Sequence, residues 1–206
     1  LRRRNDRNHR YGGEYTLTHV TRGSHFLRGY LPRIGLKKYA TAASQLIHFT
    51  GYERNVETIR LDDPLLRRVG EILGTADIIA QMSDRCYLEK CRDRLYPEFV
   101  LGGLARRKLP GGQTITVFES GSDLVRKTPG FYVNATKRLE EQLHGAYHFA
   151  EKHFGSRTNP YIEEMNKNVS YAEALADAPA EDLLRRRPPS TLLSGVRSYP
   201  KDLVII

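Results

Sequence analysis

Apolar residues recur at the three- to four-residue spacing of an α-helix along most of this chain of 206 residues. The spacing predicts helices over 16–30, 37–49 and 129–154, each ending close to a glycine or a proline. The clearest helix start is Asp63, which can cap free backbone N–H groups before Pro64 fills the first helical position. Hydrophobic residues make up 39% of the chain, enough to bury a core. We therefore expect an all-α helical bundle.

The apolar pattern that follows Pro64 is expected to form two helices. Gly74 interrupts the pattern, and Thr75 can cap the second helix. In this interpretation Asp77 lies in the first turn of that second helix. Pro97 is expected to end or kink the run, because proline lacks the N–H that a helix interior needs.

Composition divides the chain into four parts. Residues 1–101 are expected to form a helical core, and residues 129–187 further C-terminal helices. Between them, residues 102–128 are rich in glycine and predict a short strand or extended insert near 110–120. Residues 188–206 are expected to form an irregular tail.

The chain is basic, with 33 Lys and Arg against 24 Asp and Glu, so the net charge is 33 − 24 = +9. This balance favours anionic partners such as nucleotides, nucleic acid or acidic lipid without choosing among them. The short basic runs at 1–10, 106–108 and 185–187 are typical of solvated surface. No apolar run approaches the roughly 20 residues that span a bilayer, and the charged start does not resemble a signal peptide. We expect a cytoplasmic protein without membrane contact.

The two cysteines, Cys86 and Cys91, lie in one predicted helical segment. A separation of five residues turns a helix by about 500°, so the two thiols point about 140° apart. This geometry disfavours both a disulfide and a shared metal ion. We expect reduced, partly buried thiols of the kind found in cytoplasmic proteins.

Asp77 stands among apolar neighbours, and Asp84 follows two helical turns later on nearly the same face. A buried carboxylate is costly unless a cation or hydrogen-bond donors meet it. Two interpretations of Asp77 remain open: it stabilises the start of its own helix, or it binds a ligand.

Two histidines stand on the helices that precede Asp77, with His19 early in the first and His48 near the end of the second. Two imidazoles and one carboxylate from three helices would form a credible site for a divalent metal ion. His144 and His148 are four residues apart on one predicted helix, but they lack the intervening glutamate of a zinc protease motif. We interpret that pair as surface.

Four short segments carry a family resemblance. They are Thr18-His19-Val20-Thr21-Arg22-Gly23, Tyr30-Leu31-Pro32, Leu46-Ile47-His48-Phe49-Thr50-Gly51-Tyr52 and Thr75-Ala76-Asp77-Ile78-Ile79-Ala80-Gln81. Together they resemble the later helices of HD-domain metal-dependent phosphohydrolases, over roughly residues 1–99. The resemblance implies an HD-like bundle in which Asp77 is the last metal ligand and His19 and His48 are further ligands. The implied cofactor is a divalent ion: Mn, Mg, Fe, Zn or Ni.

The adjacent His-Asp pair that defines this family does not occur in the 206 residues. Two explanations stay open. We expect that the sequence continues upstream with the missing ligands, and the alternative is a divergent member without the full site.

In a complete site of this type, metal ions lower the pKa of a bound water and screen the phosphate charge. Arg22, Arg85 and Lys90 are candidates to bind the phosphate. The expected substrate is a small anionic phosphoester or nucleotide, and the expected assembly includes a homodimer. The alternatives are a non-catalytic helical module that binds a nucleotide or a protein, and a basic nucleic-acid-binding protein supported by charge alone.

Overall fold

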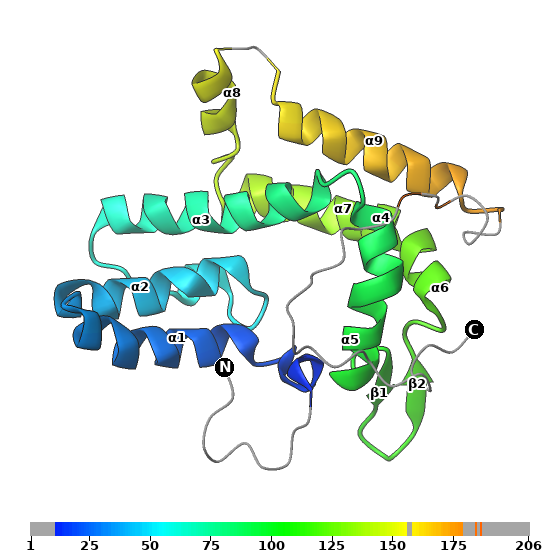
Figure 1. Ribbon diagram of the computed structural model, residues 1–206, viewed down its shortest axis with the longest axis horizontal. Helices are drawn as coiled ribbons and strands as arrows, with labels where there is room; N and C mark the ends of the chain where they lie inside the picture. Colours follow the sequence, from blue (N-terminus) through cyan, green and yellow to red (C-terminus); the bar gives the residue numbers. More distant parts are fainter. Residues whose placement is uncertain (1–10, 156–157, 179–183, 185, 187–206) are drawn as a thin grey trace.

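The computed structural model describes residues 11–155, 158–178, 184 and 186, and most of these are helical (Figure 1). The α-helices are α1 (His19–Tyr30), α2 (Ala40–Leu46), α3 (Pro64–Met82), α4 (Tyr87–Lys90), α5 (Tyr96–Leu101), α6 (Gly121–Arg126), α7 (Thr128–Lys137), α8 (His148–Phe154) and α9 (Pro160–Ala174). The strands are β1 (Arg106–Lys108) and β2 (Thr114–Thr116). Short 3-10 helices cover Gly12–Tyr15, Leu31–Ile34, Lys37–Tyr39, Ile47–Thr50 and Val56–Thr58, and π-helical turns cover Cys91–Leu95 and Arg138–Gln142. The predicted all-α character is confirmed.

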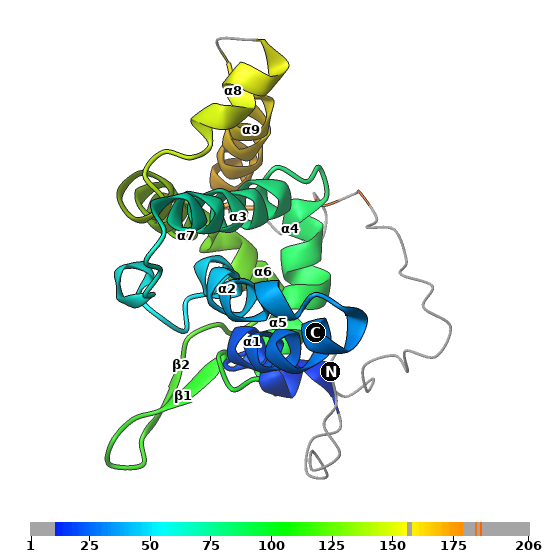
Figure 2. The same cartoon turned by 90° about the vertical axis from the view of Figure 1, so that its left-hand side faces the viewer.

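The helices form a layer with a column across one end. α1, α2 and α3 are stacked with α2 in the middle (Figure 1). At the C-terminal end of α3 the chain turns into α4, the π-turn and α5, and α6 packs against this column. α9 packs against both α3 and α7 on the side away from α1 (Figure 2). The C-terminal half of α3 is therefore where the layer and the column meet.

The expected division of α3 is wrong, because the helix continues without a break from Pro64 to Met82. Asp63 starts it as predicted, with its Oδ1 accepting a hydrogen bond of 2.8 Å from the N–H of Leu65. Gly74 is needed for close packing: an added Cβ would lie 2.5 Å from the carbonyl oxygen of Phe49. Asp77 is thus an interior residue of a long helix, so its interpretation as an early-turn acid is also wrong.

Two clusters of buried side chains form the core. The first joins the 3-10 helix after α2 to α3, α7 and α9, and contains Phe49, Val56, Ile59, Ile78, Ile79, Met82, Ala135, Leu139, Leu143 and Met165. The second lies at the column and contains Leu88, Cys91, Leu124, Val125, Ala172, Leu175 and Leu184. α9 and the residue after it contribute to both clusters, with Met165 in the first and Ala172 and Leu175 in the second. This segment therefore packs against both the layer and the column.

The single helix predicted over 129–154 is also wrong. Two consecutive left-handed residues, His144 (φ 50°) and Gly145 (φ 63°), reverse the chain between α7 and α8. His144 and His148 are therefore not on one helix. His144 Nδ1 instead lies 2.9 Å from Oε1 of the buried Glu71 on α3.

The glycine-rich insert forms a β-hairpin in which β1 and β2 pair in antiparallel fashion, with Arg107 opposite Ile115. The basic run at 106–108 is thus a strand, although it is exposed as expected. The helical path does not end at Pro97: the π-turn lies just before this residue, and Pro97 stands in the first turn of α5. The expected tail at 188–206 and the basic runs at 1–10 and 185–187 lie largely or wholly outside the described residues.

Cys86 and Cys91 are both buried and not joined, as the sequence predicts. Burial raises the pKa of the Cys91 thiol to about 12, so this thiol is protonated at neutral pH.

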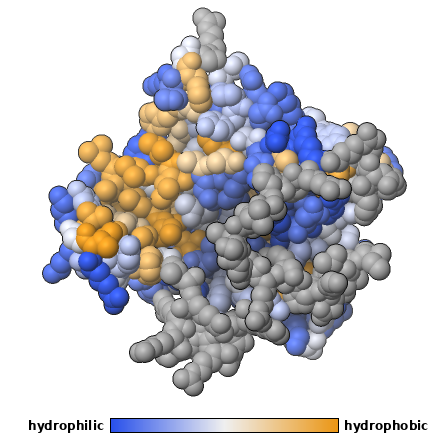
Figure 3. Space-filling model, in the orientation of Figure 1, coloured by the Kyte–Doolittle hydropathy of each residue, from blue (hydrophilic) through white to orange (hydrophobic). Residues whose placement is uncertain are grey.

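Apolar side chains gather on the surface over α2 and α3 (Figure 3). On α3 the exposed ones share one helix face and are Leu65, Val69, Ile72 and Leu73. An apolar area of this kind is typical of an interaction site, and the homodimer stays a prediction. Among the described residues, no helix is both long and apolar enough to cross a membrane.

Candidate functional site

A cavity of about 370 Å³ lies where the C-terminal half of α3 faces the α4–α5 column. Its polar lining consists of Asp77, Gln81, Asp84, Lys90, Arg94 and Glu98. Carboxylates and fixed cations therefore face one space. A metal ion could bind to the carboxylates, and an anion to the cations. Two residues singled out from the sequence, Asp77 and Lys90, are among them.

Asp77 is half-buried on α3, and its Oδ1 accepts a hydrogen bond of 3.0 Å from Gln81 Nε2. Burial raises the pKa of this carboxyl above its ordinary value, and the Gln81 hydrogen bond and the charges of His19 and Arg138 oppose the rise only in part. A carboxylate with this environment gains from a nearby cation, because a cation offsets the cost of its desolvation.

Asp84 has the opposite environment. Burial alone would raise its pKa, but hydrogen bonds from Lys90 Nζ (2.5 Å) and the Cys86 N–H (2.7 Å) hold the pKa below its ordinary value. Lys90 is therefore ion-paired inside the cavity. An incoming phosphate would have to compete with Asp84 for this ammonium group.

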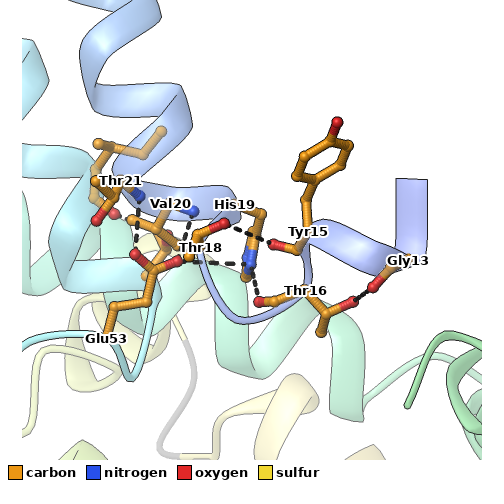
Figure 4. Close-up of polar contacts among 10 residues, drawn as sticks. Gly13, Tyr15, Thr16, Thr18, His19, Val20, Thr21 and Glu53 are labelled. Carbon is orange, nitrogen blue, oxygen red and sulfur yellow. Dashed lines mark hydrogen bonds and ion pairs between the residues drawn. The ribbon is translucent and has the colours of Figure 1, made fainter. Parts of the chain in front are cut away.

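His19 stands at the N-terminus of α1 with its ring exposed (Figure 4). Its Nδ1 lies 2.7 Å from the carbonyl oxygen of Thr16, and since a carbonyl only accepts, the proton is on Nδ1. The lone pair is then on Nε2, the arrangement found in metal-binding histidines whose other nitrogen is held by a carbonyl. When His19 is protonated, its charge acts on Asp77 and favours the ionised carboxylate, although His19 does not line the cavity.

Glu53 anchors this end of α1, a role that sequence reasoning did not assign. Its carboxylate accepts hydrogen bonds from the N–H groups of Val20 (2.8 Å) and Thr21 (3.0 Å), and its Oε1 lies 3.8 Å from His19 Nδ1 (Figure 4). Burial acts to raise its pKa, but these bonds lower it below the ordinary value. A carboxylate at a helix N-terminus is favourable, because the free N–H groups carry partial positive charge.

His48 is buried near Glu53 and, like His19, does not line the cavity. It is 2% exposed, and its Nδ1 has no hydrogen-bond partner among the described residues. Burial lowers the pKa of this imidazole, so the ring is neutral, and its charged neighbours are Arg54, Glu53 and His25. None of these three lines the cavity.

Within the residues that the structure describes, no three His, Cys, Asp or Glu side chains are grouped so that they could hold a metal ion. The structure thus brings His19 within electrostatic reach of Asp77 but does not gather His48 with them. Of the predicted ligands only Asp77 lines the cavity, and a single carboxylate suits an ion that completes its shell with water and phosphate oxygens, as Mg²⁺ does.

The predicted phosphate-binding residues are also spread out. Lys90 lines the cavity, whereas Arg22 lies on α1 with its guanidinium 3.8 Å above the Tyr15 ring. Arg85 is exposed in the turn before α4. Arg94, which no sequence pattern indicated, lines the cavity beside Lys90. Arg94 follows Lys90 by four residues, the spacing that places two side chains on one helix face.

Arg138 is a buried cation behind the site that sequence reasoning also missed. One Nη donates hydrogen bonds to the carbonyls of Phe49 (2.8 Å) and Gly51 (2.7 Å), and the guanidinium lies 4.1 Å from the centre of the Tyr52 ring. These contacts join residues more than 80 positions apart, so no local pattern could reveal them. Arg138 satisfies the carbonyls where the helical segment before Gly51 ends.

Comparisons with protein-family models, with curated proteins and with solved structures found no match to this chain.

Proposed function

We propose that this chain carries part of the site of a metal-dependent phosphohydrolase of the HD type, acting on a small anionic phosphoester. One observation supports the proposal most: Asp77 and Lys90, to which the sequence assigned metal binding and phosphate binding, line the same cavity. A carboxylate for a cation and an ammonium group for an anion are the two elements that binding of a metal–phosphoester pair requires.

Each side chain has a separate role in this proposal. Asp77 and Nε2 of His19 are the metal ligands that this part of the chain supplies. A bound divalent ion would lower the pKa of a water molecule and screen the phosphate charge. Lys90 exchanges its Asp84 partner for a phosphate oxygen, and Arg94 adds a second cation beside it. The setting is the cytoplasm, where thiols such as those of Cys86 and Cys91 stay reduced.

The test is metal binding by the Asp77→Asn variant. We expect Mn²⁺ to bind the wild-type chain and its affinity to fall at least about tenfold in the variant, because a ligating carboxylate is replaced by a neutral amide. Asp93→Asn is the matched control, since Asp93 is exposed, pairs with Arg92 and does not line the cavity. Isothermal titration calorimetry with MnCl₂ measures all three proteins.

Turnover is then assayed with p-nitrophenyl phosphate and bis(p-nitrophenyl) phosphate in the presence of Mn²⁺. Equal Mn²⁺ affinity in the wild-type chain and Asp77→Asn would refute the role of Asp77. Metal binding without turnover would show that this chain alone lacks catalytic groups.

A second candidate is a non-catalytic module that binds an anionic phosphoester. It is favoured by the absence of a three-ligand group from the described part of the chain. Affinity for a nucleotide that survives EDTA, with no hydrolysis when Mn²⁺ is added, would select this candidate over the enzyme.

A further inference from the structure

A second cavity, of about 290 Å³, lies next to the first, and its walls are mostly apolar, with four aromatic rings among them. Tyr87, Phe99, Phe118 and Phe131 contribute four rings from the α4–α5 column, the segment before α6, and α7. The polar groups in its lining are few. Lys127, one of them, is already engaged by Asp123 Oδ2 and the carbonyl of Val117, each at 2.8 Å.

The two cavities share part of their lining. Tyr87, Cys91 and Leu95 line both, and these residues follow one another at successive turns along the column. A charged compartment and an aromatic one therefore adjoin across a shared strip of side chains.

The aromatic compartment is held in shape by packing. The rings of Phe99 and Phe118 lie 5.6 Å apart and tilted by 36°, and Lys127 Nζ lies 5.5 Å from the centre of the Phe118 ring. Leu124 and Thr128 behind them are buried. Phe131 differs, because 43% of its surface is exposed and it also lines the cavity. An exposed ring in the lining can stack on a ligand.

We propose that this second cavity binds a planar aromatic group of the ligand whose phosphate lies beside Lys90 in the first cavity. The inference rests on the proposed function, since it assigns the non-phosphate part of the same substrate. An apolar cavity of about 150 Å³ is large enough to hold benzene, so the second cavity has room for a base-sized ring. Nucleotides and aryl phosphates carry both a phosphate and a planar aromatic ring, whereas sugar phosphates lack the aromatic ring.

Three probes test the assignment by isothermal titration calorimetry of the full chain in Mg²⁺ buffer. AMP carries phosphate and ring, ribose 5-phosphate carries only phosphate, and adenosine carries only the ring. We expect AMP to bind at least about tenfold more tightly than ribose 5-phosphate, as stacking on one aromatic side chain predicts. Phe131→Ala is expected to remove that difference and to leave the affinity for ribose 5-phosphate unchanged.

The matched control is Phe149→Ala, because Phe149 is similarly exposed (46%) and lines neither cavity. It should bind all three probes as the wild-type chain does. Equal affinities for AMP and ribose 5-phosphate, or an AMP affinity that Phe131→Ala does not change, would overturn the aromatic assignment while leaving the phosphate site intact.

Failure of the proposed function has a different signature. If neither phosphate ester binds, the phosphate assignment is refuted. Adenosine binding that Phe131→Ala weakens would then still support an aromatic site, and no adenosine binding would overturn that site as well.

Discussion

At the scale of single residues, Asp77 and Asp84 line the same cavity but have pKa values shifted in opposite directions. Asp77 is held in the interior of α3 with one hydrogen bond from Gln81, and burial raises its pKa. Asp84 is paired with Lys90 and accepts a hydrogen bond from a backbone N–H. These two interactions lower its pKa despite burial. Sequence spacing placed both on nearly one face of a helix; α3 ends at Met82, so Asp84 lies beyond it, yet both side chains line the cavity. Their opposite environments come from tertiary neighbours.

Replacing Asp77 by Asn is expected to raise the free energy of unfolding at neutral pH, because a partly buried charge is removed. The folded-state pKa lies above the ordinary value of 3.8. Protonated Asp77 therefore makes its full contribution to the free energy of unfolding below pH 3.8, and this contribution is lost as the pH rises through the folded-state pKa. The difference in free energy of unfolding between the Asn variant and the wild-type chain should thus shrink as the pH is lowered toward 3.8. Urea unfolding at several pH values measures it.

Asp84→Asn is the matched control and should have the opposite sign. The folded-state pKa of Asp84 is lowered, so its contribution is present above the ordinary value and is lost as the pH falls through the folded-state pKa. We expect a loss of about 1 kcal/mol at neutral pH that disappears in acid. Effects of the same sign in both variants would contradict the described environments.

At the scale of elements, α3 shows where glycine misleads a prediction made from local sequence. Gly74 was predicted to interrupt the helix, yet Gly70 and Gly74 both lie inside one helix of 19 residues. The two glycines are one turn apart, and Phe49 packs against the helix surface that they leave without side chains. A Cβ added at Gly70 would lie 2.6 Å from the Phe49 ring, and a Cβ added at Gly74 would lie 2.5 Å from the Phe49 carbonyl oxygen. The gain from packing Phe49 outweighs the roughly 1 kcal/mol that each helical glycine costs.

We expect Gly74→Ala to destabilise the protein by about 1 to 3 kcal/mol, although alanine favours helices more than glycine does. The added methyl group must displace backbone atoms of Phe49, which cannot turn away as a flexible side chain can. Gly29→Ala on α1 is the control, because nothing lies within 4 Å of its added Cβ. It should be neutral or stabilising by up to about 1 kcal/mol. Chemical denaturation checks both, and a stabilising Gly74→Ala would contradict the close packing.

At the scale of the whole molecule, α9 connects the two core clusters. Met165 belongs to the cluster under α3 and α7, whereas Ala172 and Leu175 belong to the cluster at the column. The candidate site lies between α3 and the column, so the relative position of its carboxylates and cations depends on this connection. Periodicity predicted C-terminal helices within 129–187, and α9 is one of them.

Met165→Ala and Leu175→Ala are each expected to lower the free energy of unfolding by about 2 to 5 kcal/mol, the usual range for a buried side chain truncated to alanine. Because one segment joins the clusters, both variants should shift a single transition. Val133→Ala, at a position 66% exposed on α7, is the control and should change stability by no more than about 0.5 kcal/mol. Far-UV circular dichroism and tyrosine fluorescence in urea provide two probes. Two separate transitions, each sensitive to one variant, would contradict the coupling.

The sequence by itself determined the helical class, the start of α3 at Asp63, the extended insert, the separation of the two thiols, and Asp77 and Lys90 as residues of interest. These depend on local periodicity, caps and residue chemistry, which a short window of sequence contains. The tertiary structure decided that α3 is continuous and that the helix expected over 129–154 is broken at His144. It also decided that Arg94 lines the cavity, that His48 does not, and that Glu53 and Arg138 bind backbone groups of distant segments. Each of those outcomes depends on contacts between segments far apart in the chain. Where such contacts contribute more free energy than the local conformational preference, the contacts determine the structure.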